Sequence, residues 1–380
     1  MQGETRYMLQ EKDIWKIAFN GHFYSVNTLG KMIFQLIIDG YPNYEISSKL
    51  RSQGYKDVTD AQIQTIRATI ERGKNKGKST PIRFRITILN LKRWQKVLGR
   101  LTFLFNPYVA FGIFVAFFLL SFAQYEELKD NLQYSEMSAV GILVNVFITL
   151  FIMLCHEFGH AISSLKYKVP PTEIGFGIYL YFPVLFTDVS QSWMASRIQR
   201  IVVDLSGIYF QFILMTLFLF FNYLGQYPHY VVQAFIINNV GIIFYNLNPL
   251  FKFDGYWLFC DVFKVSNLRA KSLSAFAELI YKTFHRKELR NWKYSLSIYV
   301  YSLLSISFLA FIIVSFLTFL TKSTVSFSHQ LLNETPMLEQ VLLGTIKICV
   351  LTLGGYLSIS AFLKTLLTIR QNVQLYTASK

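Results

Sequence analysis

The sequence predicts an α-helical polytopic membrane protein with about six transmembrane helices and a small N-terminal α+β winged-helix-like domain. Two observations favour this fold class. Hydrophobic residues make up 53% of the 380 residues, and they gather in runs long enough to span a bilayer. Residues 1–73 are more polar and show the periods of short strands and helices instead.

The winged-helix-like plan of residues 1–73 comes from a hairpin pattern followed by three helical patterns. The stretch DIWKIAFNGHFYSVN contains two alternating runs joined by Asn20 and Gly21, a strong short signal for a β-hairpin. The helical patterns are TLGKMIFQLIIDG, YEISSKLRSQG and TDAQIQTIRATIERG, and Thr59 or Asp60 would cap the last.

The charge distribution argues against a nucleic-acid partner. Residues 1–73 hold nine Lys/Arg and eight Asp/Glu, so this region lacks the basic footprint of a nucleic-acid binder. A membrane-bound transcription factor is therefore disfavoured. Most of the net charge of +15 lies elsewhere, with nine basic and no acidic residues in 74–101 and nine basic against four acidic in 251–293.

Six apolar segments are each long enough to cross about 30 Å of hydrocarbon. They lie near residues 103–123, 138–161, 201–224, 231–250, 295–320 and 340–366. The Lys/Arg-rich loops then fall on one side, so the positive-inside rule places both termini in the cytosol. We expect a multi-pass protein of a bacterial plasma membrane, in contact with membrane lipid.

Two further segments are expected at the membrane surface. Residues 74–102 form a basic linker and interfacial segment, because RFRITILNLKRWQKVLG mixes basic and apolar residues. The apolar stretch 175–186 is too short to span and is interrupted by Pro183, which favours an interfacial or re-entrant strand buried against protein. Residues 103–370 then form the membrane domain.

The stretch LCHEFGHAI places ionisable residues inside an apolar span, where each costs a few kcal/mol and therefore indicates a function. His156 and His160 are four residues apart, about 40° apart on one helix face, so both imidazoles could reach one metal ion. Glu157 could take a proton from a metal-bound water. The alternative is a chance match or a pair of core histidines.

A third ligand is expected from NLNPLFKFDGYW, which offers Asp254 after a span broken by Pro249. His156 lies eighteen residues into its span, about 27 Å at 1.5 Å per residue, which brings it to the same leaflet as Asp254. Asp188 and Asp204 are rival acidic ligands, although Asp204 also suits a helix N-terminus. Asp254 is favoured over these rivals because the break at Pro249 would give it the backbone freedom to turn inward.

The motif HEFGH on one span, followed by Asn246-x-x-Pro249 and Asp254-Gly255 on a later one, resembles the site-2 protease family of intramembrane zinc metalloproteases. The resemblance covers about residues 138–260 and implies a catalytic core of three spans.

The resemblance also implies a cofactor and a role for each matching residue. The implied cofactor is Zn²⁺, with His156, His160 and Asp254 as its ligands. Glu157 would be the catalytic base, and Asn246 is a candidate to polarise the scissile carbonyl. Gly207 and Gln211 are similar to a glycine motif of the family, in which many members have asparagine at the position of Gln211, so the role of Gln211 stays open.

DVSQSW, NLNPLFKFDGYW and SNLRAKS resemble a narrower branch, the peptide zinc metalloproteases, often found beside genes for ribosomally made, post-translationally modified peptides. Residues 1–73 look like the PqqD-type peptide-recognition fold, which captures a precursor's leader as an added strand. The resemblance implies a leader-bearing precursor peptide as substrate, and an ABC exporter or modifying enzyme of the same system as partner.

We therefore expect a zinc metalloendopeptidase that hydrolyses a peptide bond in a membrane-associated or ribosomally made precursor near the cytosolic face. The alternative is a non-catalytic, zinc-containing peptide receptor, or an immunity or export component, that binds the same peptide and leaves it intact.

Overall fold

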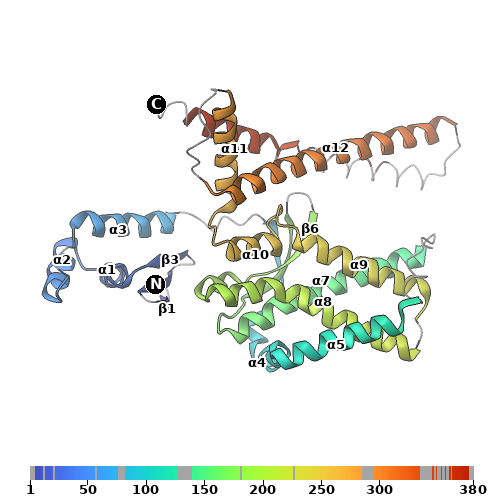
Figure 1. The fold of residues 1–380 in the computed structure, drawn as a ribbon, viewed down its shortest axis with the longest axis horizontal. Helices are drawn as coiled ribbons and strands as arrows, with labels where there is room; N and C mark the ends of the chain where they lie inside the picture. The colour runs from blue at the N-terminus through green and yellow to red at the C-terminus, as the bar shows by residue number, and fades with distance from the viewer. Residues whose placement is uncertain are drawn as a thin grey trace.

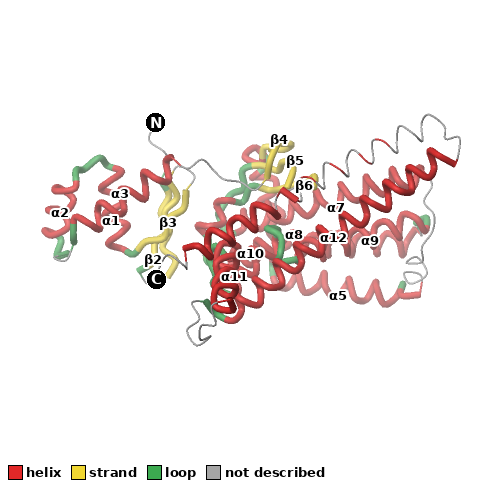
Figure 2. The backbone as a smooth tube through the Cα atoms, turned by 90° about the horizontal axis from the view of Figure 1, so that it is seen from above, coloured by secondary structure: helices red, strands yellow, loops and turns green. Residues whose placement is uncertain are grey.

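The computed structural model describes residues 5–11, 13–19, 22–55, 58–75, 82–126, 139–179, 182–225, 227–284, 294–333 and 362–375, with a few single residues between 345 and 360. It is mostly helical. A small domain that contains the first three strands lies at one end, and the long apolar helices extend toward the other (Figure 1, Figure 2).

The N-terminal sheet contains the hairpin that the sequence predicts and one strand that it does not. Strands β1 (Arg6–Glu11), β2 (Ile14–Phe19) and β3 (His22–Val26) form an antiparallel sheet in the order β1-β2-β3. The predicted turn at Asn20-Gly21 lies outside the described residues. Strand β1 escaped prediction because RYMLQE has three adjacent large side chains and no clear alternation.

Three helices complete this domain in the predicted order: α1 (Thr28–Ile38), α2 (Asn43–Ser52) and α3 (Asp60–Asn75). Thr59 caps α3, because its hydroxyl accepts from the Gln62 amide nitrogen at 3.4 Å while the Gln62 side chain accepts from the Thr59 nitrogen at 3.2 Å. The core between the helices consists of fully buried aliphatic side chains, among them Ile33, Ile46, Leu50 and Ile63.

Three described helices are long and apolar enough to cross a membrane: α7 (Ala139–Lys166), α8 (Arg197–Gly225) and α12 (Leu296–Asn333). A fourth span is possible if the helical segment Gln95–Phe105 and α5 (Pro107–Ala123) count as one, although the two are bent by 70°.

The predicted count of six spans stays a prediction. Residues 103–123 do not form one straight helix, because Asn106 caps the Tyr108 nitrogen at 2.9 Å and Pro107 takes the first position of a new helix. The apolar part of α9 (His229–Leu247) is shorter than a span. Most of the segment 340–366 lies outside the described residues.

A second antiparallel sheet joins distant parts of the chain in the order β4-β5-β6: β4 (Ile82–Asn90), β5 (Glu173–Tyr179) and β6 (Phe182–Thr187). The short apolar segment expected as a strand forms the β5–β6 hairpin. The sequence predicts only an interfacial segment at β4, since its partner strand lies some ninety residues away. Strand β6 is at an edge of the described sheet and packs against α7.

Close helix packing brings α7 and α8 together. A Cβ atom added at Gly159 would lie 2.4 Å from the carbonyl oxygen of Ser206, so only glycine permits this approach of the two backbones. Helix α7 also packs against α9, while α8 packs against α5 and α10 (Asp254–Val262). The residues singled out in α7 therefore face α8, α9 and the turn that precedes α10.

Candidate metal centre

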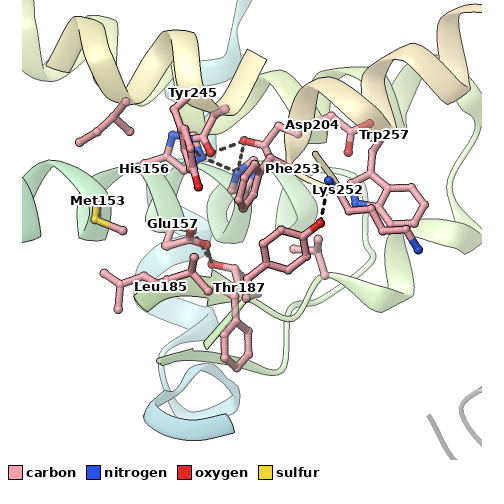
Figure 3. A pocket seen from close by; sticks show the side chains of 18 of the residues that line it. Met153, His156, Glu157, Leu185, Thr187, Asp204, Tyr245, Lys252, Phe253 and Trp257 are labelled. Atoms are coloured by element: carbon pink, nitrogen blue, oxygen red, sulfur yellow. Dashed lines mark hydrogen bonds and ion pairs between the residues drawn. The ribbon is translucent and has the colours of Figure 1, made fainter. Parts of the chain in front are cut away.

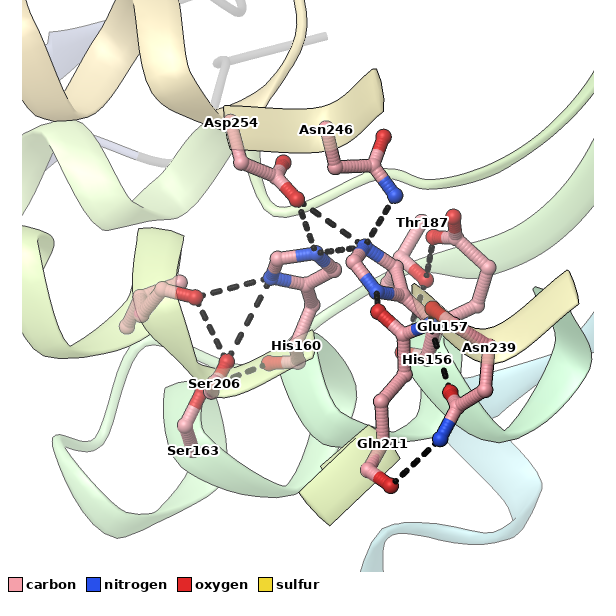
Figure 4. A network of polar contacts seen from close by, with 11 residues as sticks. His156, Glu157, His160, Ser163, Thr187, Ser206, Gln211, Asn239, Asn246 and Asp254 are labelled. Atoms are coloured by element: carbon pink, nitrogen blue, oxygen red, sulfur yellow. Dashed lines mark hydrogen bonds and ion pairs between the residues drawn. The ribbon is translucent and has the colours of Figure 1, made fainter. Parts of the chain in front are cut away.

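Helix α7 presents two imidazoles on one face, as their spacing predicts. His156 and His160 are 3% and 6% exposed, and their Nε2 atoms lie 3.1 Å apart (Figure 4). Gly207 of α8 makes room for them, because a Cβ atom there would lie 2.4 Å from the His156 ring and 2.6 Å from His160 Nε2.

The turn between α9 and α10 brings a carboxylate to the same point. Asp254 Oδ2 lies 2.9 Å from His156 Nε2 and 3.3 Å from His160 Nε2. The break after Leu247 makes this possible, and a Cβ atom at Gly255 would lie 2.1 Å from the Leu247 carbonyl oxygen. Among the described residues, this is the group of three side chains that could hold a metal ion.

Hydrogen bonds on the far side of each ring fix which nitrogen carries its proton. His156 Nδ1 lies 3.0 Å from Gln211 Oε1, and His160 Nδ1 lies 2.7 Å from the carbonyl oxygen of Val203. Both oxygens can only accept, so both Nδ1 atoms donate and both Nε2 atoms keep a lone pair. In neutral imidazoles both Nε2 lone pairs point toward the Asp254 carboxylate, an arrangement that a shared cation would stabilise.

These residues fit a zinc ion. Tetrahedral zinc with bonds of about 2.0–2.1 Å separates its ligand atoms by about 3.3 Å, close to the observed 2.9, 3.1 and 3.3 Å. Two imidazoles and one carboxylate, with a fourth position left for water or substrate, match the ligand set of catalytic rather than structural zinc sites.

Gln211 is a residue whose role the sequence left open. It is fully buried on α8, and its side-chain nitrogen donates to Asn239 Oδ1 at 2.9 Å, which orients its oxygen toward His156 (Figure 4). Asn239 donates in return to the Gln211 carbonyl oxygen at 3.2 Å. The spacing from Gly207, one helical turn earlier, was the signal that it faces the site.

Glu157 and Asn246 lie beside the three ligands. Thr187 of β6 donates a hydrogen bond of 2.7 Å to Glu157 Oε2, and the nitrogen of the Asn246 side chain lies 3.4 Å from His156 Nε2. Both line a cavity of about 750 Å³ that also contacts β6 (Figure 3). The cavity therefore combines a candidate metal site, a carboxylate and an amide donor.

The two rival acidic ligands lie on the wall of the same cavity, outside the group of three. Asp188 accepts from the Ser190 nitrogen at 3.0 Å and lies 3.9 Å from Arg85 Nη2. Asp204 extends from α8, and its Oδ2 atom is buried without a hydrogen-bond partner.

The N-terminal domain contacts a short helix that forms part of the cavity wall. Lys16 of β2 donates a hydrogen bond of 2.9 Å to the carbonyl oxygen of Trp193, and its ammonium lies 5.7 Å from the Trp193 ring. Trp193 belongs to the short helix η3 (Ser190–Met194) and packs edge-on against Trp257, and both rings line the cavity. Burial in this contact, aided by the charge of Arg200, lowers the pKa of Lys16 to about 8.

Comparison with known proteins gives one point of similarity. No protein-family model and no solved structure matches the chain. A curated protein of Bacillus subtilis (strain 168), named "Putative peptide zinc metalloprotease protein YydH", is 24% identical over 164 residues, which are 43% of this chain and 62% of that protein. The chain thus matches about three fifths of the length of this relative.

Proposed function

We propose that the protein is a zinc-dependent membrane peptidase of the site-2 protease type. The observation that carries the proposal is the convergence of three potential ligand atoms, from His156, His160 and Asp254, beside the carboxylate of Glu157. The name of the Bacillus subtilis relative supports the same class of activity, and the three apolar helices support a membrane location.

In the proposed reaction, zinc held by the three ligands would supply a Lewis acid and a water of lowered pKa. The Glu157 carboxylate would accept a proton from the attacking water and would deliver it to the nitrogen of the leaving amine. Thr187 holds the Glu157 carboxylate in place through its hydrogen bond of 2.7 Å. Asn246 donates from its side-chain nitrogen to the oxygen of the scissile carbonyl.

We further propose that the substrate enters as an extended peptide along β6. This strand lies at an edge of its described sheet, and Val184, Leu185 and Phe186 line the cavity. An edge strand offers unpaired backbone groups to which a peptide can add as another strand. A membrane-associated or amphipathic peptide fits the apolar part of this wall, and cleavage would take place near the cytosolic face.

The N-terminal domain is proposed to capture the leader of a ribosomally made precursor. Strand β3 lies at an edge of the N-terminal sheet, where a peptide could add as another strand. A groove between α1 and α3 is lined by residues that include Leu29, Ile33, Ala61 and Ile66. The contact of Lys16 with Trp193 links this domain to the cavity wall. An ABC exporter or a modifying enzyme of the same system remains the proposed partner.

The deciding experiment is mass spectrometry of peptides incubated with the purified, zinc-loaded protein in lipid nanodiscs. Amphipathic peptides from a proteome digest serve as probes, and Glu157→Gln is the matched control because it should keep zinc. New termini with wild type alone would support a peptidase with Glu157 as its base. Peptides that bind both forms and stay intact would favour the non-catalytic receptor.

A further inference from the structure

One carboxylate in the cavity has no partner. Asp204 lies on α8 and lines the cavity wall (Figure 3), and its Oδ2 atom is buried without a hydrogen-bond partner among the described residues. In the sequence Asp204 comes directly after Val203, whose carbonyl oxygen accepts a hydrogen bond from His160 Nδ1. An ionised carboxylate that is buried and unpaired costs several kcal/mol, so a ligand that pairs with Asp204 would be stabilised at this position.

The nearest cation on the same helix is already engaged. Arg200, one turn before Asp204, donates from Nε and Nη2 to the Asp261 carboxylate and from Nη1 to the Ala195 carbonyl oxygen at 3.1 Å. Arg85, which also lines the cavity, pairs with Glu173 at 2.9 Å. No described cation forms an ion pair with Asp204.

The candidate metal ion does not account for Asp204 either. Its carboxylate stands outside the group formed by His156, His160 and Asp254. The negative charges of Asp254 and Glu157 already balance the two positive charges of a zinc ion. No second group of three metal-binding side chains occurs within the described residues. A cation that enters the cavity from outside is then a candidate partner for the ionised carboxylate.

We propose that Asp204 is a specificity-determining residue, which forms a subsite for a lysine or arginine side chain close to the scissile bond of the peptide. The inference rests on the proposed peptidase function and names its substrate preference. A cationic side chain donates charge-assisted hydrogen bonds to the carboxylate and compensates its desolvation, while its methylene stem packs against the apolar wall. A neutral or acidic side chain leaves the carboxylate unpaired.

The test uses pairs of peptides that differ at one position, with lysine replaced by norleucine or arginine by citrulline. We expect wild type to prefer the cationic member by about 30-fold or more in kcat/KM, mainly through KM, because one side of a buried charge pair is lost. Asp204→Asn should reduce the preference to about threefold or less and keep its zinc. Asp188→Asn, another carboxylate of the same wall, should retain the preference.

A second measurement separates this inference from the proposed activity. Binding of the same pairs to zinc-loaded Glu157→Gln reports the subsite without hydrolysis, and Asp204→Asn in that background should remove the preference. Cleavage by wild type without a cationic preference would overturn the subsite and leave the peptidase standing. Asp204-dependent binding of lysine peptides that wild type never cleaves would overturn the peptidase and leave the subsite standing. Loss of zinc from Asp204→Asn would assign Asp204 to the metal site and overturn the inference.

Discussion

Replacing Gln211 with leucine should weaken zinc binding while the protein stays folded. The change removes the oxygen that accepts from His156 Nδ1 at 3.0 Å, and leucine fills a similar volume in this fully buried position. Without that acceptor the His156 proton is free to move to Nε2, the atom that would bind zinc. Loss of such a hydrogen bond behind a metal ligand lowers affinity by about 10- to 100-fold, or about 1.4–2.7 kcal/mol.

Competition with a chromophoric chelator measures this affinity directly on the purified protein. Asn222→Leu is the matched control, because it also removes a buried amide from α8, where the Asn222 side chain donates to Gln124 at 2.9 Å, away from the metal ligands. The control should lose stability and keep its zinc affinity. An unchanged affinity in Gln211→Leu would refute the role assigned to Gln211.

Three further predictions follow from contacts around the site. Gly207→Ala should prevent zinc binding, measured as metal content, because its Cβ atom would lie 2.4 Å from the His156 ring. Thr187→Val should lower kcat about tenfold and keep zinc, since it frees the base from a hydrogen bond of 2.7 Å. Docking of the N-terminal domain should strengthen as pH rises from about 8 to about 10, because the docked Lys16 has a pKa of about 8 and the undocked Lys16 binds its proton more tightly. Spin labels on α2 and α10 would report the distance between the two domains. Docking that weakens over this pH range would contradict the prediction.

The local patterns of the site were readable from the sequence because they depend on helix geometry, on proline chemistry and on the depth of a residue in its span. The four-residue spacing of His156 and His160 places them on one face of any helix, and the structure keeps it. The break near Pro249 was expected from proline chemistry, and α9 ends at Leu247. That Asp254 meets both imidazoles was inferred from depth in the membrane, and the observed distances of 2.9 and 3.3 Å agree.

Contacts between distant segments could not be read in this way. The pairing of β4 with β5, and the position of Thr187 beside Glu157, depend on how the loop after α7 folds back. The sequence left the role of Gln211 open, because its bond to His156 depends on the packing of α7 against α8. The lack of a partner at Asp204 is visible only when every neighbouring donor has been placed.

The central claim is that one zinc ion, held by His156, His160 and Asp254, is required for cleavage by Glu157. Its most direct test is to strip the protein with a chelator, return zinc stepwise, and measure bound zinc and peptide cleavage in the same samples. We expect cleavage to rise in proportion to zinc up to one ion per chain, and Glu157→Gln to bind the same amount without cleaving. Cleavage that continues in the stripped protein, or a fully loaded wild type that leaves every peptide intact, would contradict the account.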